Sequence, residues 1–161
     1  MSQSINLYNQ LANHKLFNKS VNFGLKRIKL ALSLLGHPEK KLKNVISVIG
    51  ESGKFTTLFS LKSFIEANNQ KVTAHISPSI QDIKERFYMS KKYLTHNEIK
   101  KTIKKIEKLN IPLTVFECLT LVYIINASTI NADYNIQETG ALWRLDSNNI
   151  NDFPIIQVCT N

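Results

Sequence analysis

The sequence predicts an α/β fold in which a mostly parallel sheet is flanked by helices. Short β-branched runs, such as residues 45–49, alternate with segments whose apolar residues recur every three or four positions. The chain has 161 residues, close to the length of one domain. Parallel strands need crossover connections and cover on both faces, so helices are expected on both sides of the sheet.

The first half of the chain predicts a polar segment followed by two helices and two strands. Residues 1–20 are polar with scattered apolar positions, and the domain proper is expected at 21–161. Apolar residues at spacings of four, three, four and three indicate a first helix that ends at Gly36. A strand at 45–49, a helix at 54–67 and a strand at 71–76 follow.

The second half predicts two further helices and two strands. An irregular segment is expected at 77–94. Two capping-box patterns then open the helices, one at Thr95 and Glu98 and the other at Thr114 and Glu117. Residues 134–137 form a weak strand candidate because they are mostly polar, and residues 155–159 form the last strand.

Composition narrows the class of protein. Hydrophobic residues make up 43%, which excludes a disordered tail, and two cysteines without a CxxC motif exclude a disulfide framework and indicate reduced thiols. No stretch is long and apolar enough to span a bilayer, so a soluble cytoplasmic protein without a membrane partner is expected. The net charge of +9 indicates either an anionic partner or a lysine-rich solvated surface.

One segment carries the pattern of a phosphate-binding turn. Residues 45–57 read as strand, glycine loop and helix, with Gly50, Gly53 and Lys54 at the turn. Glycines let the backbone wrap an anion, amides at a helix start donate to phosphate oxygens, and a lysine adds positive charge. The spacing is one residue shorter than the usual P-loop, so an ordinary tight turn is the alternative.

Six segments, in order, resemble folylpolyglutamate synthase/dihydrofolate synthase, a family of Mur-type ATP-dependent ligases. The resemblance runs from about residue 20 to the end of the chain. The segments are Leu35-Gly36-His37-Pro38, Gly50-x-x-Gly53-Lys54, 71–78 with Glu85-Arg86, Thr114 to Thr120, Glu138 to Asn149, and Val158 to Asn161. The resemblance implies a P-loop-type ATPase domain that is incomplete, because the family continues past Asn161 into a second, glutamate-binding domain.

The resemblance also implies an activity of folate biosynthesis and one-carbon metabolism. ATP phosphorylates a carboxylate of dihydropteroate or a folate, and the amine of glutamate attacks the acyl phosphate. By resemblance, ATP is bound by Gly50, Ser52, Gly53, Lys54, Thr56 and Thr57, with Lys54 as the catalytic residue. Ser77 and Glu117 would hold Mg²⁺, and Pro78 and Arg86 would contact the folate. The chain alone is expected to be inactive, and a separate chain carrying the C-terminal half is a candidate partner.

Several of these residues have simpler interpretations, and several positions depart from the family. Glu117 is equally explained as a capping-box residue, and Ser77 before Pro78 as a strand-ending turn. The departures are Glu51 and Ser52 in place of Thr-Asn, Phe55 in place of a small residue, Ser79 in place of histidine, and Leu142 and Trp143 in place of two glycines. If the Phe55 ring filled the anion cavity, phosphate binding would be lost.

Two other functions remain open on the sequence. An unrelated P-loop NTPase or kinase would need an acid at a strand end, and Glu138 is the candidate. A basic nucleic-acid-binding module is suggested by the lysines between Lys100 and Lys108. No RNP-like aromatic pattern and no zinc-ligand spacing accompany these lysines, so the sequence does not favour a nucleic-acid partner.

Overall fold

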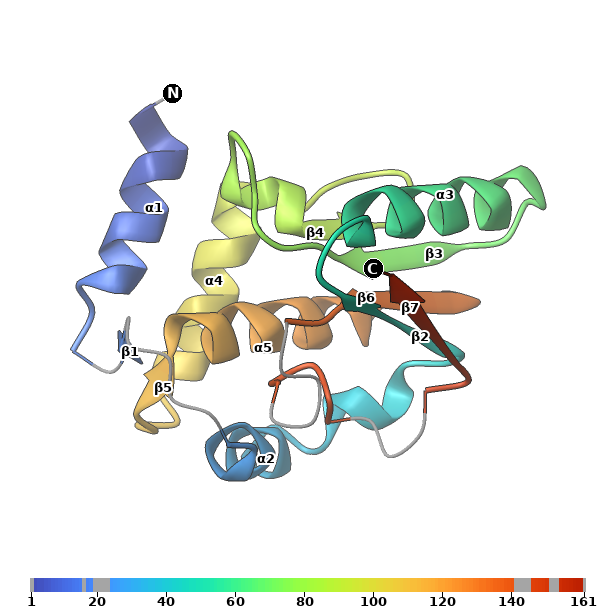
Figure 1. The fold of residues 1–161 in the computed structure, drawn as a ribbon. Coiled ribbons are helices and arrows are strands. Elements are labelled where there is room, and N and C mark those ends of the chain that lie inside the picture. The colour runs from blue at the N-terminus through green and yellow to red at the C-terminus, as the bar shows by residue number, and fades with distance from the viewer. Residues whose placement is uncertain (1, 16, 19–23, 141–145, 151–153, 161) are drawn as a thin grey trace.

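A five-stranded mixed sheet forms the centre of the computed structural model, which describes residues 2–15, 17–18, 24–140, 146–150 and 154–160 (Figure 1). The strand order is β4-β3-β6-β2-β7. The strands are β2 (Val45–Gly50), β3 (Val72–His75), β4 (Phe87–Met89), β6 (Tyr134–Glu138) and β7 (Ile156–Thr160). All neighbours pair in parallel except β3 and β4, so the predicted α/β fold with a mostly parallel sheet is confirmed.

Helices cover both faces of this sheet (Figure 1). The α-helices are α1 (Ser2–Ala12), α2 (Lys26–Leu34), α3 (Lys54–Ala67), α4 (His96–Glu107) and α5 (Val115–Ala127). Two 3₁₀ helices, η1 (Pro38–Lys41) and η2 (Ile83–Arg86), and a two-residue ladder of β1 (Phe17–Asn18) with β5 (Leu113–Thr114) complete the fold. The helix α3 lies on one face, and α5 lies on the other with α2 and α4 packed near it.

The two faces of the sheet differ in chemistry because side chains alternate along each strand. Ile46, Val48 and Ile136 point to the α3 side and pack with Leu58 of that helix. Polar residues occupy the opposite face, where the Thr73 hydroxyl lies 2.9 Å from the Tyr123 hydroxyl of α5 and 2.6 Å from Asn135 Oδ1. The polar strand β6 is therefore stable in the sheet because its buried polar groups find partners.

The strand β4 was not expected from the sequence. It occupies part of the segment predicted as irregular, and it pairs with β3 antiparallel from Thr73–Met89 to His75–Phe87. Its three residues are too few to display a period of two, and the pairing alone defines the strand. Both capping boxes are confirmed, since Thr95 and Thr114 accept hydrogen bonds from the amides of Glu98 and Glu117.

The main hydrophobic core lies on the α5 side of the sheet. It unites residues of α2, α4, α5 and β4 with Leu7 and Leu11 of α1, so part of the polar segment 1–20 packs on the domain. In the described part of the chain no helix has the length and apolar character needed to cross a membrane.

Candidate functional site

The turn between β2 and α3 has a backbone that only glycine fits at its first position. Gly50 has φ +128°, and a Cβ there would collide with the carbonyl of Thr160 on the neighbouring strand β7. Gly53 has φ +79° and is the N-cap of α3. The absence of side chains at these two positions lets the backbone turn sharply beneath the start of the helix.

Lys54 closes this turn. Its Nζ donates to the carbonyl oxygens of Gly50 and Glu51, at 2.9 Å each. The ammonium group therefore lies over the loop that the sequence pattern assigned to phosphates. The first turn of α3 contains Thr56 and Thr57 and no acidic residue, so its helix dipole presents an uncompensated positive end. The predicted ATP-binding residues are thus brought together on one backbone turn.

The Phe55 ring contacts the Phe59 ring with a centroid separation of 4.4 Å. Both rings line a small pocket of about 280 Å³, whose other walls include Ile76, Pro78 and Tyr93. The departure from the family at position 55 therefore adds an apolar wall to this pocket. Pro78 lies in this pocket after a cis peptide bond with Ser77.

Glu138, the strand-end acid that an unrelated P-loop NTPase would use, lies beside the turn. Glu138 ends β6, and its Oε2 accepts a hydrogen bond of 2.9 Å from the amide of Ser77 at the end of β3. Burial raises the pKa of Glu138, while the Ser77 amide and the positive charges of Lys54 and Arg86 oppose this rise. An acid at the end of the strand next to the glycine strand was the available signal, but the polar character of residues 134–137 weakened it.

Glu117 is engaged elsewhere. Its carboxylate accepts from the amide of Thr114 at 2.7 Å and forms an ion pair with Arg27 of α2, with an Oε1–Nη2 distance of 3.1 Å. The side chain is buried. The structure thus gives Glu117 the capping and pairing role of the simpler interpretation, and the carboxylate that contacts Ser77 is that of Glu138.

Arg86 is buried between the sheet and α1. Its carbonyl accepts from the amide of Ile76 at 3.1 Å, and its Nε has no hydrogen-bond partner within the described residues. Burial, followed by the positive charge of Arg86, lowers the pKa of His75 to about 3, so this histidine is neutral. His75 stacks on Phe87 and Tyr123, as expected for a packed histidine.

The loop after Glu138 is held by its own side chains. Asn148 Nδ2 donates to the Glu138 carbonyl at 2.7 Å, and Asp146 Oδ2 accepts from the amide of Gly140 at 2.8 Å. Leu142, Trp143 and Arg144 lie outside the described residues, so the expected effect of the two lost glycines stays a prediction.

Together, the fold and the turn define an α/β domain with a glycine-bounded strand–turn–helix motif at the carboxyl edge of its sheet. Over 147 residues the chain is 29% identical to dihydrofolate synthase/folylpolyglutamate synthase of Bacillus subtilis and 31% identical to that of Buchnera aphidicola. These alignments cover 86% and 90% of this chain but 34% and 35% of the relatives. No protein-family model matches the chain.

Solved structures agree with the sequence comparison. E. coli FolC in complex with DHPP and ADP is 31% identical, with a TM-score of 0.88 over 99% of this chain and 38% of that one. A folylpolyglutamate synthase/dihydrofolate synthase from Yersinia pestis complexed with AMPPNP and Mn is 26% identical, with a TM-score of 0.85 over 98% and 38%. The chain therefore resembles the N-terminal part of dihydrofolate synthase/folylpolyglutamate synthase and spans about a third of the length of the relatives. An unrelated P-loop NTPase is excluded by this likeness.

Proposed function

We propose that this chain is the nucleotide-binding and folate-binding part of an ATP-dependent ligase that joins glutamate to dihydropteroate or a folate. The observation that carries the proposal is the glycine turn at Gly50–Lys54, where the Lys54 ammonium lies over the turn and Glu138 and Ser77 lie beside it, on a fold similar to enzymes of that name. A cytoplasmic location goes with it, supported by the two free cysteines, Cys118 and the exposed Cys159.

The turn is the proposed site of the ATP phosphates. Backbone amides at the start of α3 and the Lys54 ammonium would donate to phosphate oxygens, with Lys54 leaving the two carbonyls that it contacts here. Ser52, Thr56 and Thr57 supply hydroxyl groups at the same turn. Charge stabilisation of this kind is the main contribution that a protein makes to phosphoryl transfer.

The proposed site of a divalent metal lies between the turn and the ends of β3 and β6. We place it on the Ser77 hydroxyl and the Glu138 carboxylate, which are hard oxygen ligands of the kind that Mg²⁺ prefers. Since the described residues contain no group of three or more His, Cys, Asp or Glu around one point, phosphate oxygens and water would complete the set. When bound, Mg²⁺ would neutralise charge on the phosphates.

The substrate is assigned to the pocket under Pro78. Phe55, Phe59 and Tyr93 give it aromatic walls suited to a flat ring system, and Glu85 lies at its edge. Arg86, with its unpartnered Nε, is proposed to attract the carboxylate that becomes phosphorylated. Attack by glutamate needs groups supplied by the rest of the enzyme, in the same or a complementing chain, so negligible turnover is expected here.

The test is binding of ATP–Mg²⁺ to the chain by calorimetry. Lys54→Ala should weaken binding by roughly tenfold to a hundredfold, the loss expected for a charged hydrogen bond. Lys71→Ala is the matched control, because Lys71 is exposed and precedes β3 at the opposite edge of the sheet. Equal affinity of the Lys54→Ala and unaltered chains would reject the phosphate role.

A further inference from the structure

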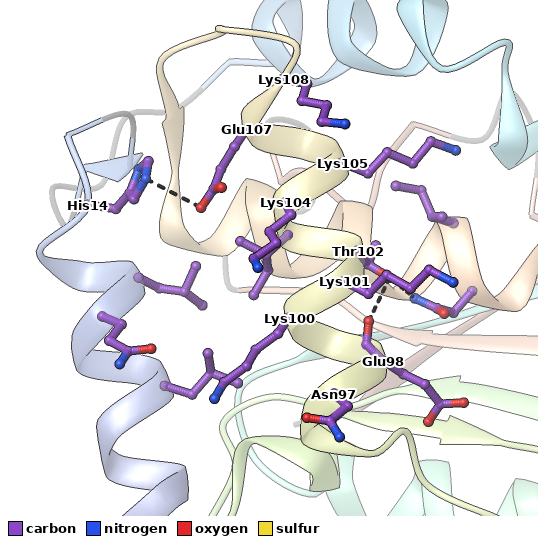
Figure 2. A pocket seen from close by; sticks show the side chains of 16 residues that line it. His14, Asn97, Glu98, Lys100, Lys101, Thr102, Lys104, Lys105, Glu107 and Lys108 are labelled. Carbon is purple, nitrogen blue, oxygen red and sulfur yellow. Dashed lines mark hydrogen bonds and ion pairs between the residues drawn. The ribbon is translucent and has the colours of Figure 1, made fainter.

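Two groups of polar side chains outside the proposed sites differ in how firmly the fold holds them. In the groove of about 1090 Å³ between α1 and α4 the polar groups include exposed lysines, of which Lys100 and Lys104 extend toward α1 (Figure 2). At the carboxyl ends of β3 and β6, by contrast, the side chains of His75 and Asn148 are both buried. Exposed lysines sample many rotamers, whereas buried polar groups need fixed partners, so the fold specifies the geometry of the second group.

Asn148 links the ends of two neighbouring strands. Its Nδ2 donates a hydrogen bond of 2.7 Å to the carbonyl oxygen of Glu138, the last residue of β6. Its Oδ1 lies 3.2 Å from Nδ1 of His75, the last residue of β3. The two strands pair in parallel as far as His75 and Gln137, so the Asn148 amide continues their connection beyond the last backbone pair.

These contacts define the orientation of the Asn148 amide and the tautomer of His75. A carbonyl oxygen only accepts, so the amide nitrogen faces Glu138 and the amide oxygen faces His75. The neutral imidazole therefore carries its proton on Nδ1 and donates it to Asn148. The buried Nε2 of His75 is then an acceptor, and it has no hydrogen-bond partner within the described residues.

The loop around Asn148 restrains its backbone. The Asn148 amide donates to Asp146 Oδ1 at 2.8 Å, and Asp146 Oδ2 accepts from the amide of Gly140 at 2.8 Å. The neighbouring Ser147 hydroxyl lies 3.1 Å from the Thr120 hydroxyl of α5. The link between the strands is thus anchored both to α5 and to the chain just after β6.

The linked strand ends carry the proposed metal ligands. Ser77 lies two residues after His75, and its amide donates to Glu138 Oε2 at 2.9 Å. We propose that Asn148 is a positioning residue of the metal site, because its amide holds the ends of β3 and β6 at the separation at which Ser77 and Glu138 bind one ion. This inference rests on the proposed function, to which the metal belongs. It adds a residue that touches neither the metal nor the nucleotide.

The experiment compares, by calorimetry, the affinity for ATP in Mg²⁺ with the affinity for ATP in EDTA. Asn148→Leu keeps a similar side-chain volume and removes both hydrogen bonds. The ratio of the two affinities should fall by about tenfold, as for other residues that hold a metal ligand in place, while the affinity in EDTA changes less than about twofold. Asn148→Ala should give the same loss and serves if the leucine variant does not fold.

Ser147→Ala is the matched control. It removes the neighbouring anchor of the same loop to Thr120, so it should lower stability and leave the ratio of affinities unchanged. A residue that only stabilises the loop would not change this ratio. A second measurement needs no variant, because long-range proton–nitrogen NMR of the unaltered chain should show His75 protonated at Nδ1 and unprotonated at Nε2.

Three outcomes would overturn the inference: a His75 proton on Nε2, an unchanged ratio in the folded Asn148 variants, or an equal loss of the ratio in Ser147→Ala. If Mg²⁺ has no effect on ATP affinity even in the unaltered chain, the proposed metal site fails, and the positioning role fails with it. The unaltered chain therefore separates failure of the proposed function from failure of the Asn148 link alone.

Discussion

The helices α3 and α5 are alike in length and in apolar pattern but differ in how much of each helix is buried. Each has 13 or 14 residues, and each carries apolar residues all around its axis. Ten residues of α5 are buried, whereas in α3 only Leu58 is. The difference arises because α5 lies between the sheet and the helices α2 and α4, while α3 is covered by the sheet alone.

The part of the fold that contributes most to stability is therefore distinct from the part that carries the proposed site. The core around α5 holds most of the fully buried side chains, so it should dominate the free energy of unfolding. The helix α3 carries the proposed phosphate-binding turn at its N-terminus and exposes Phe55 and Phe64 on its surface. A site built on the less covered helix can change conformation without disturbing the main core.

The largest expected effect is a core truncation in α5. Leu121→Ala removes a fully buried side chain and should lower the free energy of unfolding by about 2–5 kcal/mol. Phe64→Ala in α3, a larger truncation at a side chain that is 68% exposed, should change it by less than about 0.5 kcal/mol. Urea denaturation measures both, and similar losses in the two variants would contradict the comparison.

The variant Glu117→Gln tests whether Glu117, in the first turn of α5, stabilises the fold or binds a metal ion. Glu117→Gln breaks the ion pair with Arg27 and should cost about 1–3 kcal/mol of stability. Its affinity for ATP–Mg²⁺, measured at a temperature where it is folded, should match that of the unaltered chain. Loss of Mg²⁺-dependent ATP binding in this variant would show that Glu117 is a metal ligand.

The smallest expected effect is a slight increase in the free energy of unfolding at pH 8 when Glu138 is replaced by Gln. Burial raises the pKa of Glu138 above 4.5, so the folded state favours the protonated carboxyl group. The stabilisation from this preference is fully present below pH 4.5 and is lost as the pH rises through the raised pKa. Glu138→Gln removes the buried charge, so the variant should unfold at slightly higher urea concentration than the unaltered chain at pH 8.

The same variant tests the metal assignment, since Glu138→Gln should abolish the Mg²⁺ dependence of ATP binding. A residue whose removal stabilises the fold and impairs binding is expected at a functional site. If the variant is less stable at pH 8, the carboxylate is a structural group; if Mg²⁺ dependence persists, the ligand is another residue.

The amino-acid sequence by itself determined the elements whose signals are local. The helix predicted at 54–67 has the bounds that the structure shows, and both capping boxes follow from residues three apart. The glycine turn is likewise local, since Gly50, Gly53 and Lys54 lie within five consecutive residues.

Only the tertiary structure decided what depends on distant residues. The polar strand β6 is stable at the centre of the sheet because the Thr73 hydroxyl and the Lys43 carbonyl form hydrogen bonds with the buried side chain of Asn135. Glu138 lies beside Ser77, 61 residues earlier, because parallel pairing of β3 and β6 brings the ends of the two strands together. Glu117 was taken up by Arg27, 90 residues away, and no pattern within a short window could have revealed that partner.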